Sequence, residues 1–296
     1  MSSLVLGANL KIGFNAGARE VSYHDRFRFW AKIQKRNVVR LTLITPMPDD
    51  TLIGGSQEQF PLTRWSALVA VRSENAEERQ RSFAVLVAAY WKPVYKYLRL
   101  KWRKSNEDAK DLTQGFFTQA LEKGYFQNYD PAKARFRTFL RTCLDGYVAN
   151  VNKAESRLKR GGHAQMLSLD FESAEGELRH HEIADHENVE DYFEKEWLRS
   201  LFSLALATLR AECEEKQRMV HFRLFERYDL EESVTQRLTY DQLAAEFKLS
   251  VSNVTNYLAL VRREFRRLLL EKLRGLTATE EEYQQEARAV LGVDLR

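Results

Sequence analysis

A cluster of short polar side chains followed by arginines, near the C-terminal end of the chain, has the composition of a DNA-binding surface. Asparagine, serine, threonine and tyrosine side chains can hydrogen-bond to base edges or phosphates, and arginines suit phosphates. The cluster consists of Ser252, Asn253, Thr255, Asn256, Tyr257, Arg262, Arg263, Arg266 and Arg267. An ordinary helical hairpin with a solvated basic face is the alternative interpretation.

Apolar spacing around this cluster predicts two helices about three residues apart, within residues 239–268. Such spacing is typical of a helix-turn-helix. Thr239 and Gln242 form a capping-box pattern at the start of the first helix. The residues expected to be buried are Leu243, Ala244, Phe247, Val254, Leu258, Val261 and Phe265. The polar cluster then lies on the outward face of the second helix.

Two carboxylates, Asp108 and Asp111, share one side of another predicted helix, which begins at Ser105 and ends at Gly124. Its apolar stripe consists of Ala109, Leu112, Phe116 and Ala120. No base accompanies the two acids. The chain also lacks a nucleophile elbow, a phosphate-binding glycine loop and a spaced zinc motif, so we predict that it is not an enzyme.

Further helical stripes flank this helix on both sides. The upstream one contains Pro93, which should kink it, and consists of Phe83, Val87, Tyr90, Val94 and Leu98. The downstream one follows a cap at Asp130 and Pro131 and consists of Phe136, Leu140, Cys143, Tyr147 and Val151. We find no convincing strand pattern, so the predicted fold class is all-α.

Charge alternates along the chain, although the net charge is only +4. Residues 133–162 and 262–274 are basic, and residues 170–196 are strongly acidic. We therefore predict two small helical domains joined by an acidic flexible linker. The predicted segments are a poorly ordered extension (1–60), a first domain (61–162), the linker (163–189), a helix-turn-helix domain (190–275) and a C-terminal helical extension (276–296). A later start of the protein at Met47 is an alternative to the extension.

Three histidines in the predicted linker, His180, His181 and His186, are a candidate metal site, but solvated histidines are the favoured interpretation, and we predict no metal and no cofactor. Cys143 and Cys213 are far apart and lie in helical patterns, so no disulfide is predicted. The sequence contains neither a membrane-span pattern nor a signal-peptide pattern. These features predict a cytoplasmic protein that does not bind membranes.

Taken together, the order of the motifs resembles a known family. AYWKPVYKY, EDAKDLTQGFF, FRTFLRTCL and the helix-turn-helix after an acidic linker resemble the extracytoplasmic-function (ECF) sigma factors of bacterial RNA polymerase. The similarity covers roughly residues 60–290. One subgroup is resembled most closely, through TRW at 63–65, KRGG at 159–162 followed by LSLD, and YDQLAAEF.

The resemblance implies that the chain binds core RNA polymerase and promoter DNA, and it leaves an anti-sigma factor or another regulator open as a further partner. The polymerase contact would be Asp108, Asp111, Leu112, Gln114 and Phe117. The first domain would also hold the melted minus-ten strand, for which basic and stacking groups are suited, through Tyr125, Phe126, Tyr129, Arg137, Arg141, Asn150 and Lys153. Phe136 and Phe139 are expected in the core.

The same resemblance assigns the minus-thirty-five element to the helix-turn-helix, through Ser252, Asn253, Thr255, Asn256, Tyr257, Arg262, Arg263 and Arg266. The chain has Lys248 where many relatives have glycine in the turn, so a left-handed backbone there would cost about 1 kcal/mol. Two other functions stay open. A stand-alone helix-turn-helix regulator would not need the helix with Asp108 and Asp111, and a protein-only adaptor would have no salt-dependent DNA affinity.

Overall fold

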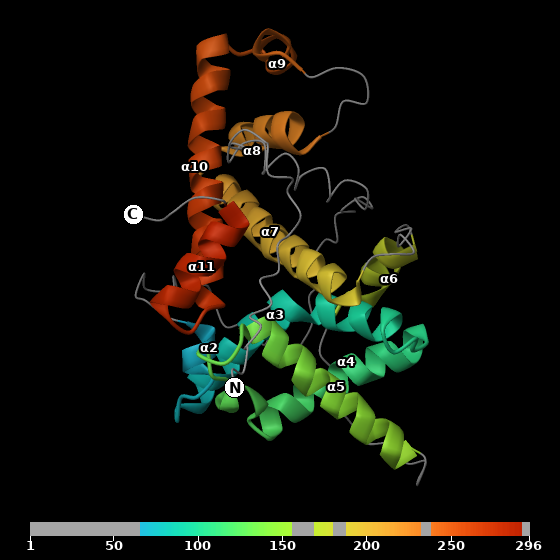
Figure 1. Cartoon of the computed structure of the whole chain (residues 1–296). Helices are drawn as coiled ribbons and strands as arrows, with labels where there is room; N and C mark the ends of the chain where they lie inside the picture. The colour runs from blue at the N-terminus through green and yellow to red at the C-terminus, as the bar shows by residue number, and fades with distance from the viewer. Residues whose placement is uncertain (1–65, 156–168, 180–187, 232–237, 292–296) are drawn as a thin grey trace, which may run out of the picture.

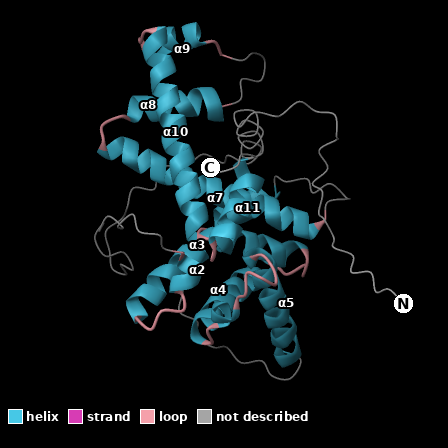
Figure 2. Ribbon diagram, turned by 60° about the vertical axis from the view of Figure 1, so that its left-hand side comes forward, coloured by secondary structure: helices cyan, strands magenta, loops and turns pink. Residues whose placement is uncertain are grey.

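The computed structural model describes residues 66–155, 169–179, 188–231 and 238–291. Every regular element within these ranges is a helix, as Figure 2 shows. The prediction of an all-α fold is therefore confirmed for the described residues. The N-terminal extension and the three linker histidines lie outside them.

The N-terminal half of the described chain is built around one long helix, α3, which begins after the capping side chain of Asn75. Pro93 lies inside α3 and does not end it. This half consists of α2 (Ala67–Ala70), α3 (Ala76–Leu100), α4 (Asn106–Glu122), the short 3₁₀ helix η1 (Tyr125–Asn128) and α5 (Phe136–Glu155).

The C-terminal half contains two more long helices, α7 and α10, with shorter helices around them. Its elements are α6 (Phe171–Arg179), α7 (Val189–Glu215), α8 (Met219–Phe225), the π-helical turn η2 (Glu226–Leu230), α9 (Tyr240–Phe247), α10 (Val251–Gly275) and α11 (Glu280–Leu291).

Helix α7 connects the two halves, because its first turns pack on α3 and its last turns pack on α10 (Figure 1). Trp197 of α7 stacks on Tyr90 of α3 with ring centroids 6.3 Å apart, and Phe202 lies 5.7 Å from Phe265 of α10. The buried apolar residues of both halves form one continuous cluster. A boundary at residue 190 therefore does not separate two independent cores among the described residues.

Part of the predicted linker is a helix packed against α3. The ring of Phe171 lies 5.4 Å from that of Trp91 and 5.3 Å from that of Tyr95. Glu175 of α6 accepts hydrogen bonds from the Tyr95 hydroxyl at 2.6 Å and from Arg99 at 2.8 Å. The structure thus differs from the flexible-linker prediction for residues 171–179, because one aromatic anchor and the ion pairs of Glu175 and Glu177 bind this acidic segment to α3.

A buried ionic network also joins α3, α6 and α7. The ammonium group of Lys96 is fully buried and lies 2.6 Å from Glu177 and 2.7 Å from Glu196. Glu196 in turn accepts a hydrogen bond from Arg199 at 2.8 Å. A charge in a protein interior is tolerated only when it is paired in this way, so the network fixes how the three helices sit together.

No helix within the described ranges is both long enough and apolar enough to cross a membrane. In the same ranges, no group of three or more histidine, cysteine or acidic side chains is arranged to hold a metal ion.

Candidate nucleic-acid interface

Helices α9 and α10 are joined by the three residues Lys248, Leu249 and Ser250. Both hydrogen bonds of the predicted capping box between Thr239 and Gln242 are present at the start of α9. Ser250 caps α10 by accepting a hydrogen bond from the Asn253 amide at 3.2 Å. Lys248 adopts a left-handed conformation with φ of 55°, so the expected cost of about 1 kcal/mol applies at this turn.

The buried side of this pair of helices contains the residues predicted for it, and Phe247 is half-buried. The outward side at the start of α10 is polar and accessible. Ser252, Asn253, Thr255 and Asn256 are exposed, and the Thr255 hydroxyl donates to the Val251 carbonyl at 3.0 Å. The two asparagine amides therefore present donors and acceptors that can reach the edges of bases.

Helix α8 extends this polar face. The His221 ring lies against the Tyr257 ring with centroids 3.9 Å apart, which leaves Tyr257 half-buried. Burial and the nearby charge of Arg218 lower the pKa of His221, which favours the neutral imidazole. An open hollow of about 750 Å³ lies here, lined in part by Arg218, His221, Asn256 and Arg263. Arg218 and His221 were not among the residues predicted from the sequence.

The arginines of α10 differ from the expectation that all of them face phosphates. Arg262 donates to both carboxylate oxygens of Asp229, at 2.8 and 3.0 Å, and Asp229 is only 4% exposed. Burial lowers the pKa of Arg262, but the hydrogen bond and charge of Asp229 together with Tyr240 outweigh burial and raise it, so the guanidinium stays charged. Arg262 thus attaches α10 to the turn that follows α8, and is a poor candidate for a phosphate contact.

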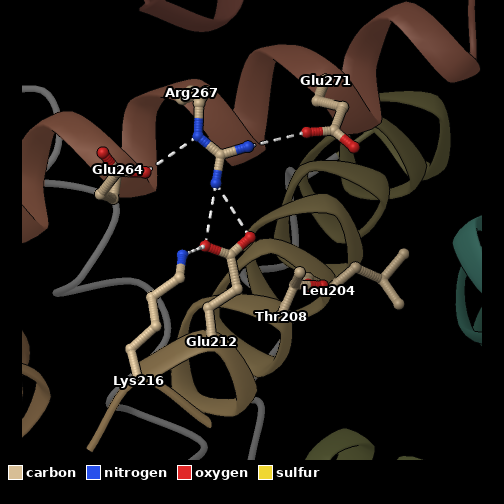
Figure 3. Close-up of polar contacts among 7 residues, drawn as sticks. All are labelled: Leu204, Thr208, Glu212, Lys216, Glu264, Arg267 and Glu271. Atoms are coloured by element: carbon tan, nitrogen blue, oxygen red, sulfur yellow. Dashed lines mark hydrogen bonds and ion pairs between the residues drawn. The ribbon is translucent and has the colours of Figure 1, made fainter. Parts of the chain in front are cut away.

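Arg267 is also engaged within the protein. Figure 3 shows its guanidinium between Glu212 of α7 and two carboxylates of its own helix, Glu264 and Glu271. The distances from Arg267 nitrogens to these three groups are 2.9, 2.9 and 3.1 Å. Among the four arginines, Arg263 is the one with an exposed side chain and no part in either cluster, and Arg266 is half-buried.

The residues predicted for the melted strand fall into two groups. Asn150 and Lys153 are exposed, and Arg141 is half-buried and donates to the Glu190 carbonyl at 3.2 Å. By contrast, Phe126 and Tyr129 belong to the core, with 1% and 3% exposure. Tyr125 is half-buried, with its hydroxyl 2.5 Å from the Gln119 side chain, and Phe136 is buried as predicted while Phe139 is half-buried.

Arg137 is inaccessible in this arrangement, with only 5% exposure. Its guanidinium lies 3.9 Å from the centroid of the Trp197 ring and is bound by Glu194 at 2.6 Å and by Glu286 at 3.0 Å. Burial alone would lower the pKa of Arg137, but the two carboxylates raise it further than burial lowers it. The prediction of a free DNA-contacting arginine therefore does not describe this conformation, because two glutamates occupy the group.

Helix α4 shows its predicted carboxylates to solvent and buries its predicted apolar contacts. Asp108 and Asp111 are exposed, and Gln114 is half-buried. Leu112 is 6% exposed and Phe117 is fully buried against Phe83 and Phe116. The accessible part of this candidate polymerase contact is thus the acidic edge, while Leu112 and Phe117 hold the helix in the core.

No known protein family, curated protein or solved structure matched this chain. Its function has to be inferred from the residues and their arrangement.

The residues of the candidate site that the sequence did not predict are those whose partners are distant in the chain. Arg218 and His221 reach the polar face only because α8 packs on α10. Glu194 and Glu286 reach Arg137 from α7 and α11. A sequence signal existed for α11, since acidic residues recur there at helical spacing, but nothing local indicated which basic groups they would meet.

Proposed function

We propose that this chain is a cytoplasmic sigma factor that binds core RNA polymerase and directs promoter recognition and transcription initiation, without catalytic chemistry or a cofactor. The observation that carries the proposal is the polar, exposed start of α10, held by a capped three-residue turn to α9. The order of motifs that resembles the ECF sigma factors adds the polymerase contact to this DNA-binding face.

In this role α10 enters the major groove with its first turns. The amides of Asn253 and Asn256 hydrogen-bond to base edges, for which adenine is the best geometric match. Arg263 and Arg218 contact phosphates on either side and position the helix without reading sequence. Arg262 and Arg267 keep α10 attached to the rest of the protein, so the reading helix is presented on a rigid support.

Polymerase binding is assigned to α4. Asp108 and Asp111 form an exposed acidic edge that suits a basic surface on the partner. Because Leu112 and Phe117 anchor α4 in the core, the edge is held in a fixed orientation. Exposed Asn150 and Lys153 at the end of α5 supply polar and basic groups for a melted strand.

The decisive experiment is in vitro transcription by core polymerase with and without the full chain. Since the promoter is unknown, sheared genomic DNA of the source organism serves as template and transcript starts are mapped by sequencing. We expect a set of new starts that share upstream sequence at two positions. The absence of chain-dependent starts would overturn the proposal.

Two binding measurements separate the alternatives. Sequence-specific DNA binding without co-purification of polymerase would instead indicate a stand-alone helix-turn-helix regulator. Absence of any salt-dependent DNA affinity, together with retained protein partners, would indicate a protein-only adaptor.

A further inference from the structure

Helix α11 is acidic on one side and apolar on the other. Its acidic residues outnumber its single basic residue, Arg288. The apolar side is buried and consists of Tyr283, Ala287, Val290 and Leu291. Figure 1 shows α11 beside the lower part of α10 with its first turns next to the N-terminal helices, so this acidic helix meets the basic first half of the chain.

The carboxylates of α11 meet three residues around the start of α5, two in the loop before it and one in its first turn. The hydroxyl of Tyr129 donates to Glu282 at 2.6 Å. Glu286 lies 3.0 Å from a guanidinium nitrogen of Arg137 and 3.6 Å from one of Arg135. Glu282 and Glu286 are one turn apart, so they follow one another by about 6 Å along the same side of the helix.

The chemistry of these contacts is that of a polyanion binding site. Two guanidinium groups and a phenol hydroxyl are donors that a nucleic-acid strand would use, and here each is bound by a carboxylate. Glu286 is only 3% exposed, and a carboxylate this deep requires charged partners. Burial and the hydrogen bond to Glu282 raise the pKa of Tyr129, which keeps its hydroxyl protonated as a donor.

We propose that α11 is an internal ligand of the surface formed by Tyr129, Arg135 and Arg137, and that it competes there with single-stranded DNA. This inference rests on the proposed function, because it takes the melted strand to be the competing ligand. Release of α11 uncovers the Tyr129 hydroxyl and one side of Arg137 and frees the already exposed Arg135 from its ion pair. Glu194 and Trp197 of α7 continue to hold the other side of Arg137. A ligand that binds only the released state shifts the population towards it by its differential affinity.

A purely structural role predicts a different outcome from a competing role. If Glu286 serves only to stabilise the fold, its neutralisation lowers the melting temperature and leaves DNA affinity unchanged or weaker. If Glu286 competes with DNA, its neutralisation weakens α11 docking and tightens DNA binding. The sign of the change in DNA affinity therefore distinguishes the two roles.

The test uses the full chain with Glu286→Gln, and with Glu282→Gln as a second variant in case the first one folds poorly. Glu281→Gln is the matched control, because it removes the same charge from an exposed position on the same helix. Binding of a labelled single-stranded oligonucleotide of about 20 nucleotides is measured at fixed salt. We expect Glu286→Gln to bind about fivefold tighter than the control, which is at the low end of typical coupling between two sites.

Hydrogen exchange of the wild-type chain supplies an independent readout. Adding the oligonucleotide should accelerate amide exchange in residues 280–291 if DNA displaces α11. Equal affinity of Glu286→Gln and Glu281→Gln, or unchanged protection of α11 with DNA bound, would overturn the inference while leaving the sigma-factor proposal intact. Failure of every form to bind single-stranded DNA would overturn the inference as well. Loss of chain-dependent transcription in the wild type would, separately, overturn the proposed function.

Discussion

Replacing Arg262 by alanine tests whether the arginines of α10 serve the fold or the DNA. Arg262 makes a two-point hydrogen-bonded ion pair with Asp229, whose side chain has no exposed surface. Removing the guanidinium leaves a buried carboxylate without its charged partner. The carboxylate of Asp229 then loses its hydration on folding without gaining an ion pair, which lowers the free energy of unfolding.

The magnitude follows from the burial of the pair. Removing one partner from a buried ion pair costs about 3 to 5 kcal/mol in free energy of unfolding. The side chain of Arg262 keeps 22% exposure, so solvent screens the pair partly and we expect a loss at the lower end, about 3 kcal/mol. Arg263 is the matched control, being the same residue type one position later and exposed. Its replacement by alanine should change stability by less than about 0.5 kcal/mol.

DNA binding should show the reverse pattern: the stable variant Arg263→Ala loses affinity, and the destabilised variant Arg262→Ala does not. Arg263→Ala is expected to weaken binding to all sequences alike and to reduce the slope of log affinity against log salt by about one. Arg262→Ala should leave that slope unchanged under conditions in which the variant stays folded. Denaturant unfolding of the full chain measures the free energy of unfolding, and a salt titration with duplex DNA measures the slope of log affinity against log salt.

A double-mutant cycle completes the test. In a chain that already carries Asp229→Asn, the further change Arg262→Ala should cost less than about 1 kcal/mol, because no buried charge is left unpaired. An Arg262→Ala variant of wild-type stability with a reduced salt slope would refute the assignment. It would show that Arg262 contacts phosphate despite its pair with Asp229.

The remaining predictions concern the turn, the reading helix and the acidic edge. Lys248→Gly should raise the free energy of unfolding by about 1 kcal/mol by denaturant titration, because glycine relieves the left-handed strain; Lys248→Ala, which keeps the Cβ atom, should not. Asn256→Ala should cost about 1 to 3 kcal/mol on the preferred promoter and much less on random duplex DNA, and equal losses on both would contradict base reading. Asp111→Arg should weaken pull-down of core polymerase at unchanged helical content, whereas Glu122→Arg, an equal charge change at the exposed end of α4, should have no such effect.

Local patterns predicted helices α9 and α10 well. The stripe Val254, Leu258, Val261 and Phe265 is buried as the 3.6-residue period requires. The capping box at Thr239 also follows the sequence, whereas the left-handed conformation at Lys248 occurs despite a residue type that disfavours it. The stripe and the capping box depend on residues within one or two turns of each other, which is why a single sequence is enough to predict them.

Long-range pairing was not predictable in the same way. Phe171 looked like an isolated aromatic residue in an acidic linker, yet it inserts between Trp91 and Tyr95, about 80 positions upstream. Arg137 looked like one more charge on a basic helix, although its partner Glu194 is 57 positions away. Periodicity gives the face on which a side chain lies, but it does not give the element that packs against that face.

The distribution of charge within the fold explains why counting basic residues does not identify the groups that are accessible to DNA. The chain has 46 basic and 42 acidic side chains, and within the described residues many basic groups are paired with acidic ones. Arg137, Arg262 and Arg267 are each bound by carboxylates from a different helix or turn. A paired guanidinium must break its ion pair before it binds phosphate. Exposed groups outside these ion pairs, such as Arg263 and Arg218, are therefore the better candidates for binding DNA at little cost. The same pairing that removes positive charge from the proposed DNA-binding surface joins α7, α10 and α11 to their neighbours. The acidic residues therefore stabilise the fold and, under the proposed function, leave few positions for nucleic-acid binding.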